Sequence, residues 1–201
     1  MAQVGLGLLR QHLNSDDQVH GIVTKGGEAA NIIPGEASAR YFYRSTDLHS
    51  LSMLEPRVKA CFEAGAIATG AILDVQPLGP PYSEFVHDHD LIGKYRKNAE
   101  SLGRVFSPPS SKLAGSTDIA NVSLLMHTIH PMLGLDSGTA VNHQPEFAAY
   151  CRTPDADRAA VEGALAMALT AVDAASDDET RTRLLGHKTS YSEIGEYPWS
   201  F

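Results

Sequence analysis

The fold is decided by residues 18–44, which read QVHGIVTKGGEAANIIPGEASARYFYR. Gln18 to Lys25 places Val19, Gly21 and Val23 on one side and His20, Ile22 and Thr24 on the other, so this segment is predicted to be a strand. Gly26-Gly27 ends it, and Glu36 to Arg44 alternates as a second strand. The intervening NIIPG, residues 31–35, is predicted to be a loop of defined shape.

Helical patterns flank these strands. A short helix is predicted to begin almost at Met1, with Val4, Leu8 and Leu9 on one side, and to end at residues 14–17. After the second strand, Thr46 and Asp47 are predicted to cap a longer helix that ends at Gly70. Its apolar side recurs at spacings of three and four and comprises Leu51, Leu54, Val58, Phe62 and Gly65.

Two features near the end of this first region carry further predictions. Pro56 lies inside the long helix, so we expect a kink or a late start there. Ala71 to Gln76 is predicted to be a third strand. The Pro/Gly-rich residues 77–81 form the best candidate domain boundary.

The second half of the chain has a different pattern. Asp90 to Leu102 is predicted to be a helix closed by Gly103, and Val122 to Met126 is a candidate buried strand. The clearest helix is Asp155 to Ala175. Its apolar stripe consists of Val161, Leu165, Leu169 and Val172.

Composition limits the possible partners. The 201 residues carry a net charge of -8 and no basic stripe, which disfavours nucleic acid or an anionic membrane as the main partner. Cys61 and Cys151 are far apart and lack CxxC spacing, so neither a disulfide framework nor a zinc knuckle is expected. The N-terminal residues lack the basic and apolar regions of a signal peptide. We therefore expect a cytoplasmic protein.

Several separated motifs occur in a fixed order along the chain. They are VHGIVTKGG (19–27), ANIIPG (30–35), the strand ending at Arg44, GSTD (115–118) with NVS (121–123), and Asn142-His143 with Phe147. Together they resemble the zinc amidohydrolases, the metallopeptidase family of aminoacylases, glutamate carboxypeptidases and succinyl-diaminopimelate desuccinylase. The likeness is strongest to the branch of p-aminobenzoyl-glutamate hydrolase and its dipeptidase relatives, and it covers residues 4–175.

The resemblance implies an α/β subunit of two domains. Residues 1–78 would form a ferredoxin-like α+β lid that makes homodimers and here lacks its first strand; residues 79–175 would be the C-terminal segment of an α/β catalytic domain. Residues 176–201 are a polar tail outside the resemblance. The family's front half carries a His-x-Asp pair, a bridging Asp and adjacent Glu residues, and no Glu-Glu pair occurs in this sequence.

The resemblance assigns catalytic chemistry to two histidines. His143 would be a ligand of one of two zinc ions, although a loop histidine can also act as a cap or simply face water. His20 would reach the partner subunit's active site and stabilise the oxyanion formed when water attacks the amide carbonyl. Without the resemblance, a histidine on a strand is more often structural.

Substrate binding is assigned to polar groups on the lid. The Asn31 amide can hold a carboxylate or a carbonyl, or else satisfy its own turn. Arg44 can pair with a carboxylate through two hydrogen bonds, which suits a small acidic acyl amino acid or a dipeptide. Arg40, on the same strand face by alternation, is interpreted as an ordinary surface charge.

A second group of binding residues belongs to the catalytic segment. Gly115, Ser116 and Thr117 form a loop whose N–H groups and hydroxyls can bind substrate. Asp118 follows as a possible cap, and a plain N-cap explains it equally well. By contrast, residues 87–90, His-Asp-His-Asp, are interpreted as a helix entrance with Asp90 as N-cap and exposed histidines, not as a metal site.

The function implied by the resemblance is metal-dependent hydrolysis of an amide or peptide bond, in an N-acyl amino acid, an aminobenzoyl-glutamate-like compound or a dipeptide. In a complete relative, two zincs activate a water, a glutamate takes its proton, and His20 stabilises the intermediate. With the base and most ligands absent, this chain alone is expected to be inactive. The alternatives are a non-catalytic dimerisation module and a small-molecule binding protein.

Overall fold

The structure is a computed structural model that describes residues 1–106 and 115–186. The chain divides between Glu84 and Phe85 into two parts, called here unit 1 and unit 2. Glu84 belongs to unit 1 because its Oε2 accepts a hydrogen bond from the Leu48 N–H at 3.0 Å. The boundary predicted at residue 78 stays a prediction, and the two units are described separately below.

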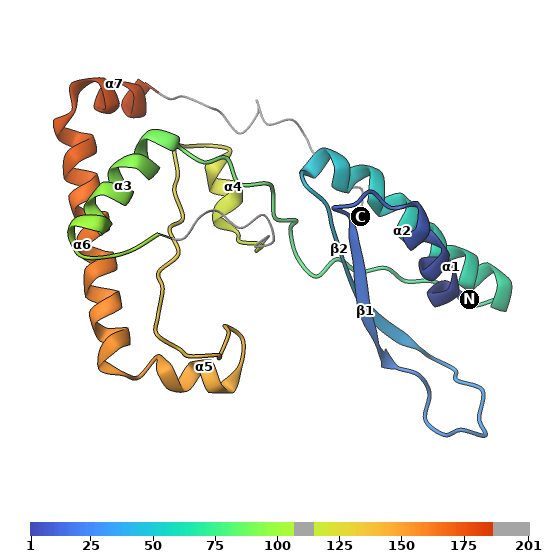
Figure 1. Cartoon of the computed structure of the whole chain (residues 1–201). Helices are drawn as coiled ribbons and strands as arrows, with labels where there is room; N and C mark the ends of the chain where they lie inside the picture. Colours follow the sequence, from blue (N-terminus) through green and yellow to red (C-terminus); the bar gives the residue numbers. More distant parts are fainter. Residues whose placement is uncertain (107–114, 187–201) are drawn as a thin grey trace. The chain divides into compact units, whose positions relative to one another are not determined.

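Unit 1 is built around two antiparallel strands, β1 (Gln18–Lys25) and β2 (Ser38–Arg44). Gln18 lies opposite Arg44, and His20 lies opposite Phe42. The observed bounds of β1 confirm the predicted strand, and β2 begins two residues later than expected. Helix α1 (Ala2–Leu9), a 3-10 turn η1 (Arg10–His12) and α2 (Leu48–Thr69) complete the unit (Figure 1).

The core of unit 1 forms where both helices meet one face of the strands. Leu6, Val19, Leu54 and Val58 are buried together, and Tyr41, Tyr43 and Phe62 pack around them. On α1, Leu6 is buried and Leu9 packs against the core, whereas Val4 and Leu8 are exposed. Gly5 lets α1 approach α2 closely, since a Cβ there would lie 3.3 Å from the Cβ of Cys61.

Helix α2 has the two ends that its sequence predicts. Asp47 is the N-cap, and its carboxylate accepts a hydrogen bond from the Ser50 N–H at 2.7 Å. Gly70 closes the helix with a φ of 69°, a left-handed conformation that favours glycine. The helix starts at Leu48 and continues through Pro56, so the late start is wrong.

The third strand predicted at Ala71 to Gln76 is not observed. Ile72 in this segment is 99% exposed. A strand needs a neighbour to satisfy its backbone N–H and C=O groups. Among the described residues the sheet of unit 1 has two strands only, and neither of them pairs with this segment. The local pattern therefore favours extended backbone, but the partner that would make it a strand is missing from the described part of the chain.

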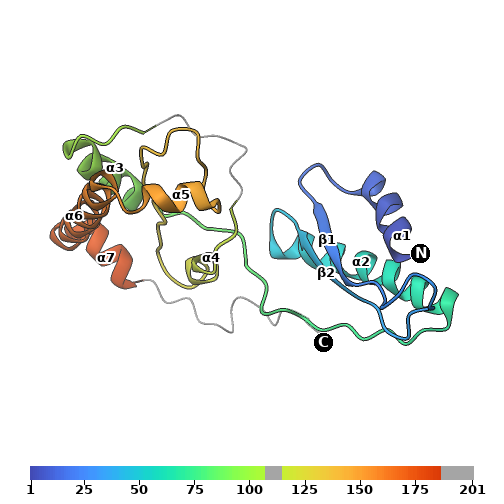
Figure 2. The same cartoon turned by 90° about the horizontal axis from the view of Figure 1, so that it is seen from below.

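Unit 2 contains five helices within the described residues. They are α3 (His89–Ser101), α4 (Ile119–Ser123), α5 (Pro145–Tyr150), α6 (Pro154–Ser176) and α7 (Asp178–Gly186). Helices α3 and α6 lie side by side (Figure 2). Tyr95 and Ala99 of α3 are buried with Ala166 of α6. This helix pair forms the core of unit 2.

One prediction for unit 2 is wrong, and the structure adds detail to two others. Val122 to Met126 is not a strand, because α4 occupies its start and the buried Ser123 hydroxyl donates to the Ala120 carbonyl at 2.6 Å. In the apolar stripe of α6, Val161, Leu165 and Val172 are exposed and Leu169 is half-buried, since the buried side of that helix consists of small residues. The start of the polar tail forms helix α7, and its residues 187–201 lie outside the described part.

Helix α6 is unusual in composition. Among the described residues it is the helix long and apolar enough to cross a membrane, with a window of mean hydropathy 1.3. Charged side chains nevertheless lie along one flank of this helix. Glu162 pairs with Arg104 at 2.7 Å, and Asp173 accepts a hydrogen bond from Asn98 at 2.8 Å. Such charged groups are costly inside a bilayer. Length and composition alone are also typical of a helix from a protein core.

The orientation of α1 gives a matched test. Leu6 is 2% exposed and Leu8 is 58% exposed on the same helix. Leu6→Ala is expected to lower the free energy of unfolding by about 3 kcal/mol, because it leaves a cavity in the core of unit 1. Leu8→Ala is expected to change it by less than about 0.5 kcal/mol. Urea unfolding followed by circular dichroism measures both, and equal effects would contradict this packing of α1.

Candidate functional site

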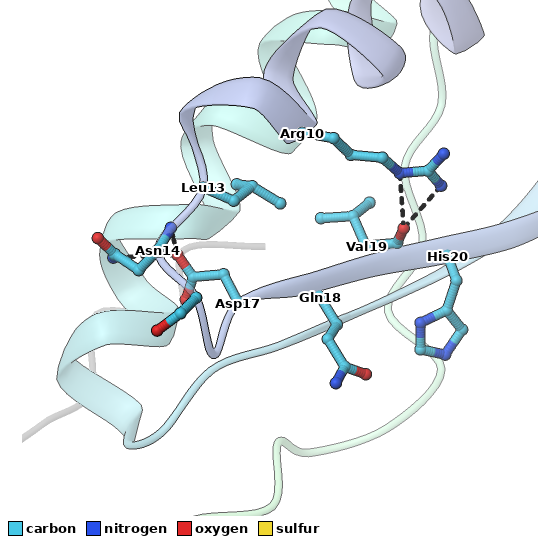
Figure 3. Close-up of a pocket in the computed structure, with 8 residues that line it drawn as sticks. Arg10, Leu13, Asn14, Asp17, Gln18, Val19 and His20 are labelled. Atoms are coloured by element: carbon cyan, nitrogen blue, oxygen red, sulfur yellow. Dashed lines mark hydrogen bonds between the residues drawn. The ribbon is translucent and has the colours of Figure 1, made fainter.

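His20 and Arg44 lie on the face of the β1–β2 sheet that the helices do not cover. In Figure 3 the Val19 side chain points toward Leu13, whereas Gln18 and His20 point to the opposite side of the strand. On β2, Tyr41 and Tyr43 pack on the core while Phe42 and Arg44 are exposed. The uncovered face therefore carries an imidazole, an aromatic ring and a guanidinium.

The strand register brings these groups close together. The rings of His20 and Phe42 are stacked with centroids 6.3 Å apart. Arg44 is a diagonal neighbour of His20, a relation that places Cβ atoms about 7–8 Å apart and within reach of long side chains. Arg40 lies on the other side of Phe42 and on the same face. This arrangement can present positive charge and a hydrogen-bond donor to a carboxylate or a carbonyl oxygen.

A surface depression of about 520 Å³ lies beside His20 at the start of β1 (Figure 3). Its charged residues are already engaged. The Arg10 guanidinium donates to the Val19 carbonyl at 2.8 and 3.2 Å, and the Asp17 carboxylate accepts hydrogen bonds from Asn14 and Ser45. These contacts stabilise the turn before β1, and the depression does not include Asn31 or Arg44.

Asn31 is exposed in the long loop between the two strands. The loop is closed at its base by an ion pair between Lys25 and Glu36 at 2.8 Å. Gly27 has a φ of 134°, and a Cβ there would lie 2.9 Å from Pro34, so the loop requires glycine at this position. A turn bond from the Ile32 N–H to the Ala29 carbonyl at 3.2 Å then presents Asn31 at the surface.

Gly115, Ser116 and Thr117 lead into α4 of unit 2. Gly115 and Ser116 are exposed, and the Thr117 carbonyl accepts a hydrogen bond from the Ala120 N–H at 3.2 Å. Asp118 occupies the N-cap position, but its side chain makes no capping hydrogen bond. Capping therefore does not explain Asp118.

His143 has an uncommon backbone conformation. Its φ is 68°, and it is the one non-glycine residue with positive φ in the described part of the chain. The left-handed conformation costs an L-residue on the order of 1–2 kcal/mol, and such residues are concentrated at functional sites. The side chain is exposed just before α5, where Pro145 starts the helix. The imidazole is thus accessible to a ligand from outside unit 2.

The described residues do not fit a zinc site. Zinc in proteins takes three or four His, Cys, Asp or Glu ligands. Within residues 1–106 and 115–186 no group of three such side chains is placed to hold a metal ion. His143 can supply one ligand only, and a zinc centre would need further ligands from polypeptide beyond these residues.

The His-Asp-His-Asp segment is structural, as expected, but its N-cap is Asp88 and not Asp90. Asp88 is buried, and one carboxylate oxygen accepts from the Leu91 N–H at 3.0 Å. Arg183 of α7 contacts both of its oxygens, at 2.5 and 3.1 Å, and the Nδ1 of His127 lies 2.6 Å from one of them. His87 and His89 are exposed, as expected.

These contacts change the acidity of Asp88. Burial alone would raise the pKa of its carboxyl group, but the hydrogen bonds from Arg183 and from the Leu91 N–H outweigh burial and lower the pKa. Arg183 also reaches Asp90 at 3.1 Å, so one guanidinium ties α7 to the start of α3. The contact between Arg183 and Asp88 could not be predicted from local sequence patterns, because the two residues are 95 positions apart. Phe42 was also missed, although period-two alternation places it on the face of Arg44.

Comparison with known proteins found two curated relatives, and no family model matches the chain. The chain is 31% identical over 176 residues to Xaa-Arg dipeptidase of Mus musculus, a match that covers 86% of this chain and 41% of the relative. It is 30% identical over 176 residues to Xaa-Arg dipeptidase of Homo sapiens, covering 86% and 40%. The chain thus spans about two fifths of the length of these relatives. The matches support a relationship to peptidases and do not identify the branch.

Arg183 provides a test of the contact between α7 and α3. Arg183→Ala is expected to lower the free energy of unfolding at pH 7 by about 2 kcal/mol, because the buried Asp88 carboxylate loses its main cationic partner. The folded-state pKa of Asp88 is lowered, so its ion pair stabilises the fold fully above the unfolded-state pKa of about 3.9. This stabilisation is lost as the pH falls through the folded-state pKa. The difference between wild type and variant should therefore shrink below about pH 4.

The measurement is urea unfolding at a series of pH values. Arg158→Ala is the control, because Arg158 makes only an exposed pair with Asp155 on α6. Such a pair contributes about 0.2–1 kcal/mol. If Arg183→Ala were no more destabilising than Arg158→Ala at pH 7, the contact would have no structural role.

Proposed function

We propose that this chain is part of a metal-dependent dipeptidase or a closely related amidohydrolase, and that it contributes substrate-binding and catalytic groups to hydrolysis of an amide bond. The observation that carries the proposal is the 31% identity to Xaa-Arg dipeptidase of mouse across 86% of the chain. Because the chain corresponds to about two fifths of that relative, the remaining catalytic groups would come from additional polypeptide.

The uncovered face of unit 1 supports a role in substrate binding. Dipeptides and N-acyl amino acids both end in a carboxylate, and Arg44 carries the matching charge in a form that can make two hydrogen bonds. His20, whose ring lies 6.3 Å from that of Phe42, can donate to the oxyanion of a tetrahedral intermediate. Asn31 and the Gly115–Thr117 loop would supply further polar contacts in the assembled enzyme.

The proposed assembly includes a second copy and a metal. Exposed Val4 and Leu8 on α1, together with the strand edges of unit 1, provide a surface through which two copies can pair. His143 would donate one imidazole to the zinc ions that the amidohydrolase resemblance implies. A non-catalytic dimerisation module is the second candidate function, and the same exposed α1 residues favour it.

The isolated chain gives the first test. It is expected to bind zinc weakly and to show little or no hydrolysis of arginine-containing dipeptides, N-acyl amino acids or p-aminobenzoyl-glutamate, because the described residues offer an incomplete ligand set. Calorimetric zinc titration and amine-release assays measure both properties. A chimera in which this chain replaces the matched segment of the mouse relative should hydrolyse an Xaa-Arg dipeptide. A folded, zinc-loaded chimera without activity would contradict the proposed function.

The same chimera tests His20. His20→Ala is expected to reduce kcat/KM by 10²–10³-fold, about 3 kcal/mol, which is the usual effect of removing one oxyanion donor. Ile22→Ala is the matched control, since Ile22 lies two residues further along the same strand face and is exposed. Equal losses in the two variants would indicate that His20 has a structural role only.

A further inference from the structure

Helix α6 has apolar residues on two opposite sides. One side packs in unit 2 and is made of small residues, namely Ala159, Gly163, Ala166, Thr170 and Ala174. The large apolar residues Val161, Leu165 and Val172 lie on the other side, with exposed fractions of 67%, 44% and 59%. A helix that is apolar on both sides is typical of the interior of a larger protein.

From Val161 to Ala175 the exposed side of α6 is broad and free of charge, and the exposed Asp157 and Arg158 lie on the same side one turn earlier. Val161, Leu165, Ala168, Val172 and Ala175 recur at spacings of four and three residues, so they share one side of the helix. Ala164 and Ala171 widen this stripe beyond the narrow seam of a coiled coil. Glu162 lies on the flank, where it pairs with Arg104. The stripe therefore has the width of a helix that faces the core of a layered domain.

An apolar groove continues this stripe toward α7. It has a volume of about 440 Å³, and Met167, Ala171 and Ala175 of α6 form one wall. Leu184 and Leu185 of α7 form the other wall. Leu91 of α3, Ile129 and Pro131 also line the groove, and Arg181 of α7 is the charged residue in its lining. The groove is therefore mostly apolar and adjoins the exposed stripe at Ala171 and Ala175.

The length of the relatives indicates what covers this surface. The match covers 86% of the chain. A match of this length includes nearly all of α6 whichever residue it starts from, so the relatives contain a segment that corresponds to this helix. About three fifths of the relative's own length lies outside the match. Building on the proposed function, we propose that the exposed stripe of α6 and the adjoining groove dock an apolar layer formed by that remaining part of a dipeptidase chain.

The experiment mixes the full chain with a separate polypeptide comprising the part of the mouse Xaa-Arg dipeptidase outside the match. The two are expected to form a one-to-one complex in size-exclusion chromatography with light scattering. Leu165→Glu and, separately, Val172→Glu should weaken the complex at least about tenfold, because each would bury an unpaired carboxylate. Val105→Glu, at an exposed loop position of unit 2, should change affinity less than about twofold.

Circular dichroism shows whether each variant is folded, and neither stripe variant should change the thermal midpoint, since both side chains point away from α3. The proposal is overturned if no complex forms, or if the stripe variants bind as well as Val105→Glu. It is also overturned if the stripe variants instead break a dimer of this chain, or abolish its flotation with phosphatidylcholine vesicles. A complex that forms but does not hydrolyse an Xaa-Arg dipeptide supports the docking surface and contradicts the proposed function.

Discussion

The close packing of α3 on the small-residue side of α6 determines which parts of unit 2 stay exposed. Gly163 shows how tight this side of α6 is, because a Cβ there would collide with the Leu133 side chain. Tyr95 and Ala99 of α3 are buried near Ala166 for the same reason. With small residues directed inward, the larger Val161, Leu165 and Val172 must point outward. The packing of α3 on the small-residue side of α6 thus forms the core of unit 2 and also leaves the larger apolar residues of α6 exposed.

Features set by neighbouring residues could be predicted from the sequence. Strand β1 follows from alternation, and α2 has the N-cap Asp47 and the C-terminal Gly70 that its sequence indicates. Features that depend on distant partners could not be predicted. Residues 71–76 have the pattern of a strand, but within residues 1–106 and 115–186 no strand pairs with them. In α1 and α6, apolar periodicity alone could not reveal which apolar side is packed.

The same distinction applies to the candidate site. Period-two alternation correctly places Arg40 and Arg44 on one strand face, opposite the face that packs on the helices. The positive φ of His143 depends on its loop and has no local signal that separates it from other histidines. The ion pair between Arg183 and Asp88 joins residues far apart in the chain, and Asp88, in a segment that resembles a metal motif, also serves as the N-cap of α3.

Unit 1 and unit 2 each leave groups exposed that folded proteins normally cover. In unit 1 these are the apolar residues of α1 and the extended segment around Ile72. In unit 2 they are the apolar stripe of α6 and the imidazole of His143, whose backbone has a positive φ. Isolated exposed apolar residues are ordinary, but a continuous apolar surface marks an interface. Strain at a surface histidine likewise persists only where its surroundings fix it. The assembly proposed above, with further polypeptide that completes both the packing and the ligand set, would account for these exposures together. A free-standing binding module would explain the site residues only and leave the α6 surface unexplained.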